Sequence, residues 1–268
     1  MTTFERPLTR RKAIATLAAL GGGALGACFG PDELEPFSVA PRLSARPGVP
    51  SETGAVGVTP FTVGSANGVA YVPAELSAPA PLLLFLHGAG GIVEPFLQAF
   101  MPAADTAGVV LLFPYSFGGS WDAIGGSFGP DILGINASLH WVFDRWQVDA
   151  SRIVMTGFSD GATYALAVGR ANGDLFSRVV AHAPGFLIEV DKVGQPPILI
   201  THGTQDAILP IDRTSRLIVP QLRANGYDVD YRELDMGHAV PLSVANEVIA
   251  SLGAQAAGER RFGHGRVE

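Results

Sequence analysis

The sequence predicts an α/β fold, in which helices flank a mostly parallel central sheet within a single domain. Short apolar runs such as Pro81–His87 are typical of strands that are buried on both faces. These runs alternate along the chain with segments of helical periodicity, the order that builds parallel sheets. Of the 268 residues, 47% are hydrophobic and 16% are charged, which excludes a disordered chain. No apolar run reaches the roughly 18–20 residues of a spanning helix, which excludes a polytopic membrane protein.

The predicted elements follow one another in the order that this fold requires. Eight segments are predicted as strands, and they are Val56–Val63, Gly68–Val72, Pro81–His87, Val109–Phe113, Arg152–Thr156, Arg178–Ala183, Pro197–Thr201 and the more polar Asp228–Leu234. The first two are expected to pair through a turn at 66–68. Apolar residues recur at helical spacing in 131–146, 160–171, 212–225 and 240–252. Residues 254–268 are predicted to form a disordered tail.

The amino-terminal residues 1–27 predict export from the cytoplasm. A basic stretch at 10–12 precedes a short apolar run and small residues, as in a bacterial signal peptide. The pair Arg10-Arg11 resembles a twin-arginine signal, whose substrates cross the membrane already folded. The expected location is the periplasm or the cell envelope.

Cys28 is the single cysteine of the chain, so no intramolecular disulfide can form. Leu25-Gly26-Ala27-Cys28 resembles a lipobox, which makes Cys28 a candidate for lipid attachment and membrane tethering. The alternative is ordinary cleavage nearby, which would leave a free thiol. Residues 28–55 contain five prolines and little periodicity, and they are predicted to form a tether to a catalytic domain over 56–253.

The charge of the chain limits its partners. The net charge is −7, and the leader is basic, so the remainder is more acidic still. An acidic body repels phosphate backbones, which disfavours nucleic-acid binding. The sequence has neither a His/Cys metal-ligand spacing nor a phosphate loop, so it implies no metal and no organic cofactor. No obligate protein partner is implied either.

A nucleophile is predicted at Ser159, within Gly157-Phe158-Ser159-Asp160-Gly161. This G-x-S-x-G sequence follows a predicted strand and opens a predicted helix. A sharp turn between strand and helix brings backbone segments together, so glycines are needed on both sides of the serine. The serine hydroxyl would then stand at the carboxyl end of the sheet, beside the positive end of a helix dipole.

A glycine-rich loop, His87–Gly91, leaves another predicted buried strand. Its backbone can turn N–H groups toward a carbonyl oxygen, and we expect Ala89 N–H and Asp160 N–H to form an oxyanion hole, with Gly90 N–H as a substitute. A plain glycine-rich turn is the alternative. A dinucleotide-binding fingerprint does not fit, because the spacing is not G-x-G-x-x-G.

A serine hydroxyl needs a base that is itself oriented by a carboxylate. His238 follows the last predicted strand and is the candidate base. His87 belongs to the glycine-rich loop, and His264 lies in the tail. Structural roles are expected for the remaining histidines, His140, His182 and His202.

Asp206 is the candidate acid, because it lies just past the end of a predicted strand. Asp212 is expected to cap the following helix. Asp235 is so near His238 in sequence that it could orient the ring only through an unusual turn. The side chain of Asp160 is expected to cap its helix or to point to solvent. The resulting order is serine, aspartate, histidine, as described for α/β-hydrolases.

With these pieces the sequence resembles exported serine esterases of the α/β-hydrolase fold. This group includes proteins like polyhydroxybutyrate depolymerase, feruloyl esterase and phospholipase/carboxylesterase. The resemblance covers Val56 to Leu252, and it rests on His87–Gly91, Gly157–Gly161, Gly203–Asp206 and Gly237-His238. Secreted polymer depolymerases of this kind carry disulfides and a substrate-binding module, and this sequence has neither. The departure favours a small soluble ester over a polymer.

The loop 116–130 is expected to lie at the same sheet edge as Ser159. Trp121 in this loop is a candidate substrate-binding aromatic, or it is part of a packed surface loop.

The expected function is that of a carboxylic ester hydrolase, which forms an acyl-enzyme on a small or medium ester. A lysophospholipase and a serine peptidase or amidase are alternatives on the same fold. A catalytically silent envelope lipoprotein that binds a ligand is the alternative from another class.

Overall fold

The computed structural model describes the backbone of residues 39–262 and the side chains of residues 39–254. The expected export leader, Cys28 and the first part of the expected tether lie outside these residues. Within the described part of the chain, no helix is long and apolar enough to cross a membrane.

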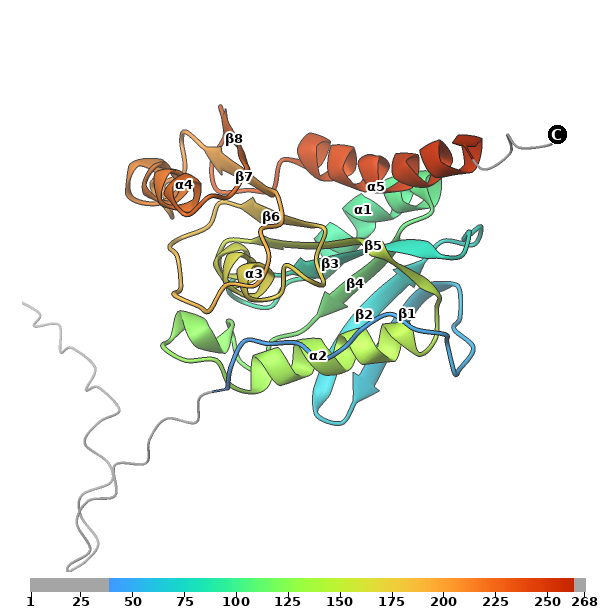
Figure 1. Cartoon of the computed structure of the whole chain (residues 1–268). Helices are drawn as coiled ribbons and strands as arrows, with labels where there is room; N and C mark the ends of the chain where they lie inside the picture. Colours follow the sequence, from blue (N-terminus) through green and yellow to red (C-terminus); the bar gives the residue numbers. More distant parts are fainter. Residues whose placement is uncertain (1–38, 263–268) are drawn as a thin grey trace, which may run out of the picture. The chain divides into compact units, whose positions relative to one another are not determined.

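The described elements alternate between strands and helices (Figure 1). In chain order they are β1 Gly57–Val63, β2 Ala66–Val72, β3 Ala80–Leu86, α1 Glu94–Ala107, β4 Val110–Pro114, η1 Asp122–Ile124, α2 Pro130–Phe143, β5 Val148–Phe158, α3 Asp160–Ala171, β6 Arg178–His182, β7 Ile198–Gly203, η2 Ile211–Arg213, α4 Ser215–Ala224, β8 Val229–Leu234 and α5 Leu242–Phe262.

One eight-stranded sheet runs through the molecule in the order β1-β2-β4-β3-β5-β6-β7-β8. The pairs β1/β2 and β2/β4 are antiparallel, and every other pair is parallel. The carboxyl ends of β3 to β8 therefore meet at one edge of the sheet. Loops that leave this edge carry Ser159, Asp206 and His238, so the topology alone brings the candidate residues to the same side.

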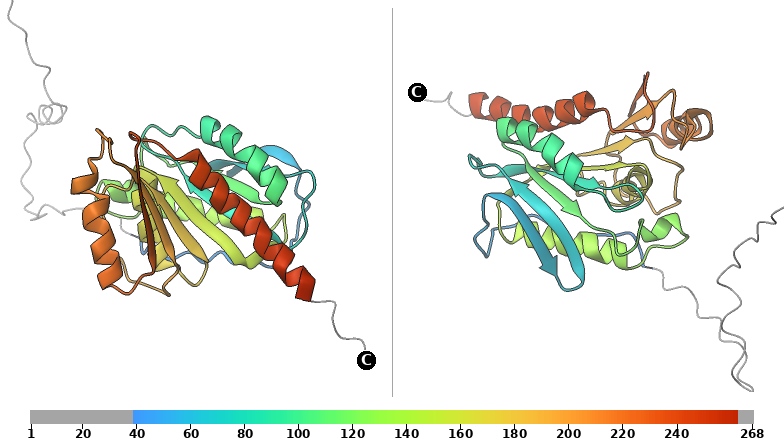
Figure 2. Two further views of the ribbon diagram at one scale, coloured as in Figure 1. Left: turned by 90° about the horizontal axis from the view of Figure 1, so that it is seen from above. Right: turned by 180° about the vertical axis from the view of Figure 1, so that it is seen from behind.

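Helices cover both faces of the sheet. Helices α1 and α5 pack together on one face (Figure 2), where Leu83, Phe85 and Val154 point from the central strands. Helices α2, α3 and α4 cover the other face and bury the alternate strand residues. Strands that are covered on both sides can be apolar at every position, and every residue of β3 is buried.

The eight predicted strands and the four predicted helices are all present. Helix α1 was not predicted, although Leu97, Phe100 and Ala104 on its buried face have helical spacing. Pro102 within the helix conceals this signal, because proline is disfavoured in helix interiors.

Two predicted boundaries are wrong. The turn between β1 and β2 lies at Gly64-Ser65, and the register pairs Phe61 with Gly68 inside the hairpin. Gly68 is needed there because a Cβ would lie 2.5 Å from the Phe61 ring. The predicted disordered tail begins too early, since α5 extends to Phe262; residues 263–268 lie outside the described part.

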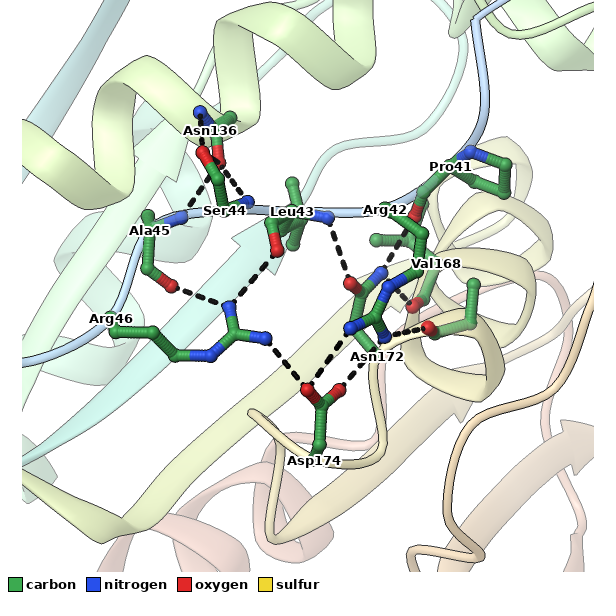
Figure 3. A network of polar contacts seen from close by, with 11 residues as sticks. Pro41, Arg42, Leu43, Ser44, Ala45, Arg46, Asn136, Val168, Asn172 and Asp174 are labelled. Carbon is green, nitrogen blue, oxygen red and sulfur yellow. Dashed lines mark hydrogen bonds and ion pairs between the residues drawn. The ribbon is translucent and has the colours of Figure 1, made fainter.

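The prediction of a tether over residues 28–55 is also wrong for its described part. Residues 39–52, here called the strap, lie along α2 (Figure 1). Side-chain amides of Asn136 and Asn172 bind the strap backbone (Figure 3). Asn172 accepts from Leu43 N–H at 2.8 Å and donates to Pro41 O at 2.7 Å. Leu43 is 2% exposed, so the strap belongs to the core despite its prolines.

Candidate active site

Ser159 stands in a strained turn between β5 and α3. Its backbone has φ 56° and ψ −118°, a left-handed conformation that is costly for a residue with a Cβ. The chain passes close to itself on both sides of the serine. A Cβ on Gly157 would lie 2.3 Å from Gly161 O, and one on Gly161 would lie 2.2 Å from Leu86 O. Both glycines of the predicted turn are therefore required by close backbone contacts.

The three candidate residues form one chain of hydrogen bonds. His238 Nε2 lies 2.9 Å from Ser159 Oγ, and His238 Nδ1 lies 2.6 Å from Asp206 Oδ2. A carboxylate only accepts hydrogen bonds, so Nδ1 carries the imidazole proton and Nε2 is free to accept from the serine hydroxyl. This arrangement allows His238 to remove the serine proton while Asp206 orients the ring.

The Asp206 carboxylate is buried and fully bonded. Its Oδ1 accepts hydrogen bonds from Ile208 N–H at 2.9 Å and from Leu209 N–H at 2.8 Å. Burial works to raise the pKa of Asp206, but the hydrogen bonds from Leu209 N–H, His238 and Ile208 N–H outweigh it. The pKa of this carboxyl therefore lies below its ordinary value, and the group is ionised near neutral pH.

Two backbone N–H groups near the nucleophile lack a hydrogen-bond partner within the described part of the chain. Gly88 packs on the serine, since a Cβ on Gly88 would lie 3.3 Å from Ser159 Cβ. Among the described residues, neither Ala89 N–H nor Asp160 N–H has a hydrogen-bond partner. Gly90 N–H, the alternative donor, is bound to Gly119 O at 2.7 Å. The arrangement thus favours Ala89 and Asp160 as donors to an oxyanion.

The side chain of His87 holds the glycine-rich loop in place through hydrogen bonds of both ring nitrogens. Its side chain is fully buried, with Nδ1 2.8 Å from Gly88 O and Nε2 accepting from Ser116 N–H at 3.1 Å. Burial lowers the pKa of His87, although its bond to Gly88 O works in the opposite direction. Both contacts suit a neutral ring that is protonated at Nδ1, so His87 shapes the loop as a structural residue.

Trp121 does not lie where a substrate-binding aromatic was expected. It is 1% exposed, and its indole N–H donates to His87 O at 2.8 Å. Its ring packs on His87 and Tyr164, with centroid distances of 4.8 and 5.2 Å. The prediction of an exposed aromatic is therefore wrong, because the indole fills the core beneath the loop and supports the His87–Gly91 backbone.

Asp122 and Asp131 hold the loop 116–130 together beside the site, because each carboxylate accepts a hydrogen bond from the backbone N–H of the other residue. Asp122 Oδ2 accepts from Asp131 N–H at 2.9 Å, and Asp131 Oδ2 accepts from Asp122 N–H at 2.6 Å. Burial raises the pKa of Asp131, and bonds from Phe117 N–H and Asp122 N–H oppose the rise. No sequence pattern indicated this reciprocal pair, since each carboxylate meets its partner only after the loop has closed.

Two further predictions about side chains are corrected. Asp160 neither caps α3 with its side chain nor points freely to solvent, because its Oδ2 accepts a hydrogen bond from Ser120 Oγ at 2.5 Å. Asp212 lies in η2 and pairs with Arg216 instead of capping α4. The Ser120 contact links the loop 116–130 to the first residue after the nucleophile.

His202, which was expected to be structural, lies against the Asp206 carboxylate at 3.2 Å. The spacing of four residues between the two could have indicated this contact, because His202 lies at the carboxyl end of β7 and Asp206 lies in the loop that follows. Within residues 39–254, no group of three or more His, Cys, Asp or Glu side chains is arranged to hold a metal ion. Cys28 lies outside the described residues.

Solved structures share this architecture over most of the chain. An acetyl xylan esterase from Aspergillus awamori superposes with a TM-score of 0.56 at 16% identity, over 74% of this chain and 98% of that one. A thermostable esterase superposes with a TM-score of 0.55 at 21% identity, over 76% of this chain and 62% of that one. The fold is that of the α/β-hydrolases.

Sequence comparison relates this chain to esterases. A family model described as Phospholipase/Carboxylesterase matches residues 135–254. An acetylxylan esterase of Emericella nidulans is 26% identical over 151 residues, which are 53% of this chain and 49% of that protein. A feruloyl esterase of Thermothelomyces thermophilus is 28% identical over 115 residues, 40% of each chain. The matches thus span about half or less of the length of these curated relatives.

Proposed function

We propose that this α/β-hydrolase is a serine-dependent carboxylic ester hydrolase that acts through an acyl-enzyme on small or medium esters. The observation that carries the proposal is the continuous chain of hydrogen bonds from Asp206 through His238 to Ser159. It supplies an oriented base within reach of a serine hydroxyl, and the two unpartnered N–H groups beside it suit a developing oxyanion.

The reaction follows from these positions. Ser159 Oγ bonds to the ester carbonyl carbon while its proton passes to His238 Nε2. The carbonyl oxygen becomes an oxyanion, which Ala89 N–H and Asp160 N–H stabilise by about 3 kcal/mol per donor. The bond to the alcohol oxygen then breaks, and His238 returns the proton to the leaving alcohol. Water, deprotonated by His238, attacks the acyl-enzyme in the same way and releases the acid and the serine hydroxyl.

A lysophospholipase is the second candidate. The matching family model carries the word phospholipase in its description. Exposed apolar side chains also occur on loops at the carboxyl edge of the sheet, with Phe117 and Phe186 each 45% exposed and Ile208 69% exposed. Such side chains suit a substrate with an apolar chain. A panel of short acyl esters, aryl esters, lysophospholipids and amides separates this candidate and the amidase alternative from the principal proposal.

The test of the principal proposal is a covalent one. The protein is treated with a fluorophosphonate, and its intact mass is recorded beside Ser159→Ala. We expect one stoichiometric adduct on the wild type, none on the variant, and hydrolysis of at least one ester by the wild type alone. A folded wild type that takes up no label would overturn the proposal and favour a ligand-binding lipoprotein without catalytic activity.

Export and lipid attachment at Cys28 are part of the same proposal, and they are supported by the leader sequence alone. The periplasm or the cell envelope would then be the place of action, with the enzyme tethered to a membrane. The intact mass of protein from the membrane fraction tests this point, because acylation adds mass that Cys28→Ser lacks. An unacylated wild type would leave export without a lipid anchor.

A further inference from the structure

A second histidine touches the acid of the candidate site. His202 is the penultimate residue of β7 and is 2% exposed. Its Nε2 lies 3.2 Å from Asp206 Oδ2 and 2.8 Å from Leu209 O. The same Oδ2 is the atom that lies 2.6 Å from His238 Nδ1. One carboxylate oxygen therefore faces two imidazole rings.

The partners of His202 define where its proton lies. A carboxylate and a carbonyl both only accept hydrogen bonds, so Nε2 carries a proton that is shared between Asp206 and Leu209 O. On the other side of the ring, Nδ1 lies 2.7 Å from Ser215 Oγ. Ser215 is fully buried, and among the described residues its hydroxyl has no other acceptor, so it donates to Nδ1. The ring is neutral and held in one tautomer.

The charged surroundings of His202 agree with a neutral ring. Asp206 and His238 face it from the loops after β7 and β8, and Glu233 is its register partner on β8. Glu233 is in turn paired with Arg216 of α4. Burial lowers the pKa of His202; Leu209 O and Asp206 oppose this, and the nearby His238 adds to it. Two rings that share one carboxylate cannot easily both be charged.

We propose that His202 is a positioning residue of this site, which donates its Nε2 proton to Asp206 and thereby fixes the carboxylate for His238. The inference rests on the proposed esterase function. With His202 in place, each oxygen of the carboxylate has two donors, Ile208 and Leu209 N–H on Oδ1 and the two histidines on Oδ2. Without it, Oδ2 keeps His238 as its one donor, and the orientation of the carboxylate is less restricted.

The test compares His202→Phe, which removes the donor at similar volume, with His202→Gln, whose amide can donate from the same place. We expect His202→Phe to lower kcat/KM roughly ten- to hundredfold, the range for losing one hydrogen bond to a charged group. The loss should fall on kcat with KM unchanged. The acid limb of the kcat/KM profile should also move to higher pH, because more of the carboxylate charge is left for His238. His202→Gln should restore most of both.

His182→Phe is the matched control. His182 is 1% exposed on the neighbouring strand, and its ring bonds Thr201 Oγ1. This variant should leave the midpoint of the acid limb at its wild-type position. If His202→Phe proves too unstable to purify, Ser215→Ala replaces it, since loss of the hydroxyl frees the ring to change tautomer. Ser215→Ala should then lower kcat while KM stays constant.

A measurement without turnover keeps this inference separate from the proposed function. The proton between His238 Nδ1 and Asp206 gives a downfield proton NMR signal, which should shift in His202→Phe and stay in His202→Gln and His182→Phe. A signal and pH profile that are unchanged in His202→Phe would overturn the role of His202. Equal impairment of a folded His202→Gln would overturn it as well. An unlabelled wild type with the expected NMR shifts would contradict the esterase function alone.

Discussion

At the scale of single residues, the turn around Ser159 depends on glycines, because there is no room for a side chain on either side of it. Ser159 adopts a positive φ. The backbone can pass close to itself on both sides of the serine because Gly157 and Gly161 have no side chains. Gly161 lies against the carbonyls of Leu86 and His87, at 2.2 and 2.4 Å from the position of a Cβ. The first carbonyl ends β3 and the second begins the glycine-rich loop His87–Gly91, so the turn after β5 and this loop are in direct backbone contact.

Gly161→Ala should therefore damage the site as well as the fold. Its Cβ meets backbone carbonyls, which cannot move away as a flexible side chain would. We expect loss of fluorophosphonate labelling and a fall of at least about 1–3 kcal/mol in the free energy of unfolding. Gly48→Ala is the control, because a Cβ there meets nothing within 4 Å. Wild-type labelling of Gly161→Ala would show that the close approach is not needed.

At the scale of elements, the strap adds a layer that is held mainly by two asparagines. Asn172 is fully buried at the end of α3 and bonds Leu43 N–H, Pro41 O and Val168 O. Asp174 pairs with Arg42 and Arg46 at the surface, with side chains about 40% exposed. Arg42 and Arg46 lower the pKa of Asp174 to about 2. Exposed pairs of this kind contribute little to stability.

The two contacts should differ in their effect on stability. Asn172→Ala leaves a buried N–H and a carbonyl without partners, and we expect it to lower the free energy of unfolding by about 1–3 kcal/mol. Asp174→Asn should lower it by less than about 1 kcal/mol. Urea unfolding of both variants measures the difference. A larger effect for Asp174→Asn would mean that the charges, and not the buried amide, hold the strap.

At the scale of the whole molecule, three buried histidines tie stability to pH. Burial lowers the pKa of His87, His182 and His202, and for His182 it does so to about 4. In the unfolded chain these rings bind protons near their ordinary pKa of about 6.5. Between the two values the unfolded state holds more protons, so the free energy of unfolding falls as the pH falls. The stability is fully present above the unfolded pKa.

The contribution of His182 can be isolated by substitution. We expect the free energy of unfolding of the wild type to decrease from about pH 7.5 to about pH 5, with His182 contributing at most about 1.4 kcal/mol per pH unit. His182→Gln should show a smaller decrease, whatever its stability at neutral pH. Urea titrations at both pH values measure this, with the slope m as a check on the unfolding transition. Equal decreases in both proteins would contradict the prediction.

Some features of the whole molecule could be predicted from the sequence, and others could not. The strands and the turn around Ser159 were predictable because each depends on a short segment. The contacts of Ser159 with His238 and of His238 with Asp206 agree with their expected places at one edge of the sheet. The place of Trp121 was not, since an aromatic in a glycine-rich loop reads the same whether it faces solvent or His87 O. The strap depends on packing between elements that are distant in the sequence, and no local pattern encodes it.

The strap also bears on how the protein could be mounted on a support. The described chain starts at Val39, whose N–H bonds Phe128 O in the loop next to the candidate site. It leaves through α5, where Gly253 lies against Ala107 near the opposite edge of the sheet (Figure 1). Attachment at Val39, the first described residue, would turn the Ser159 edge toward the solid phase. A handle at the carboxyl end would present that edge to the bulk solution.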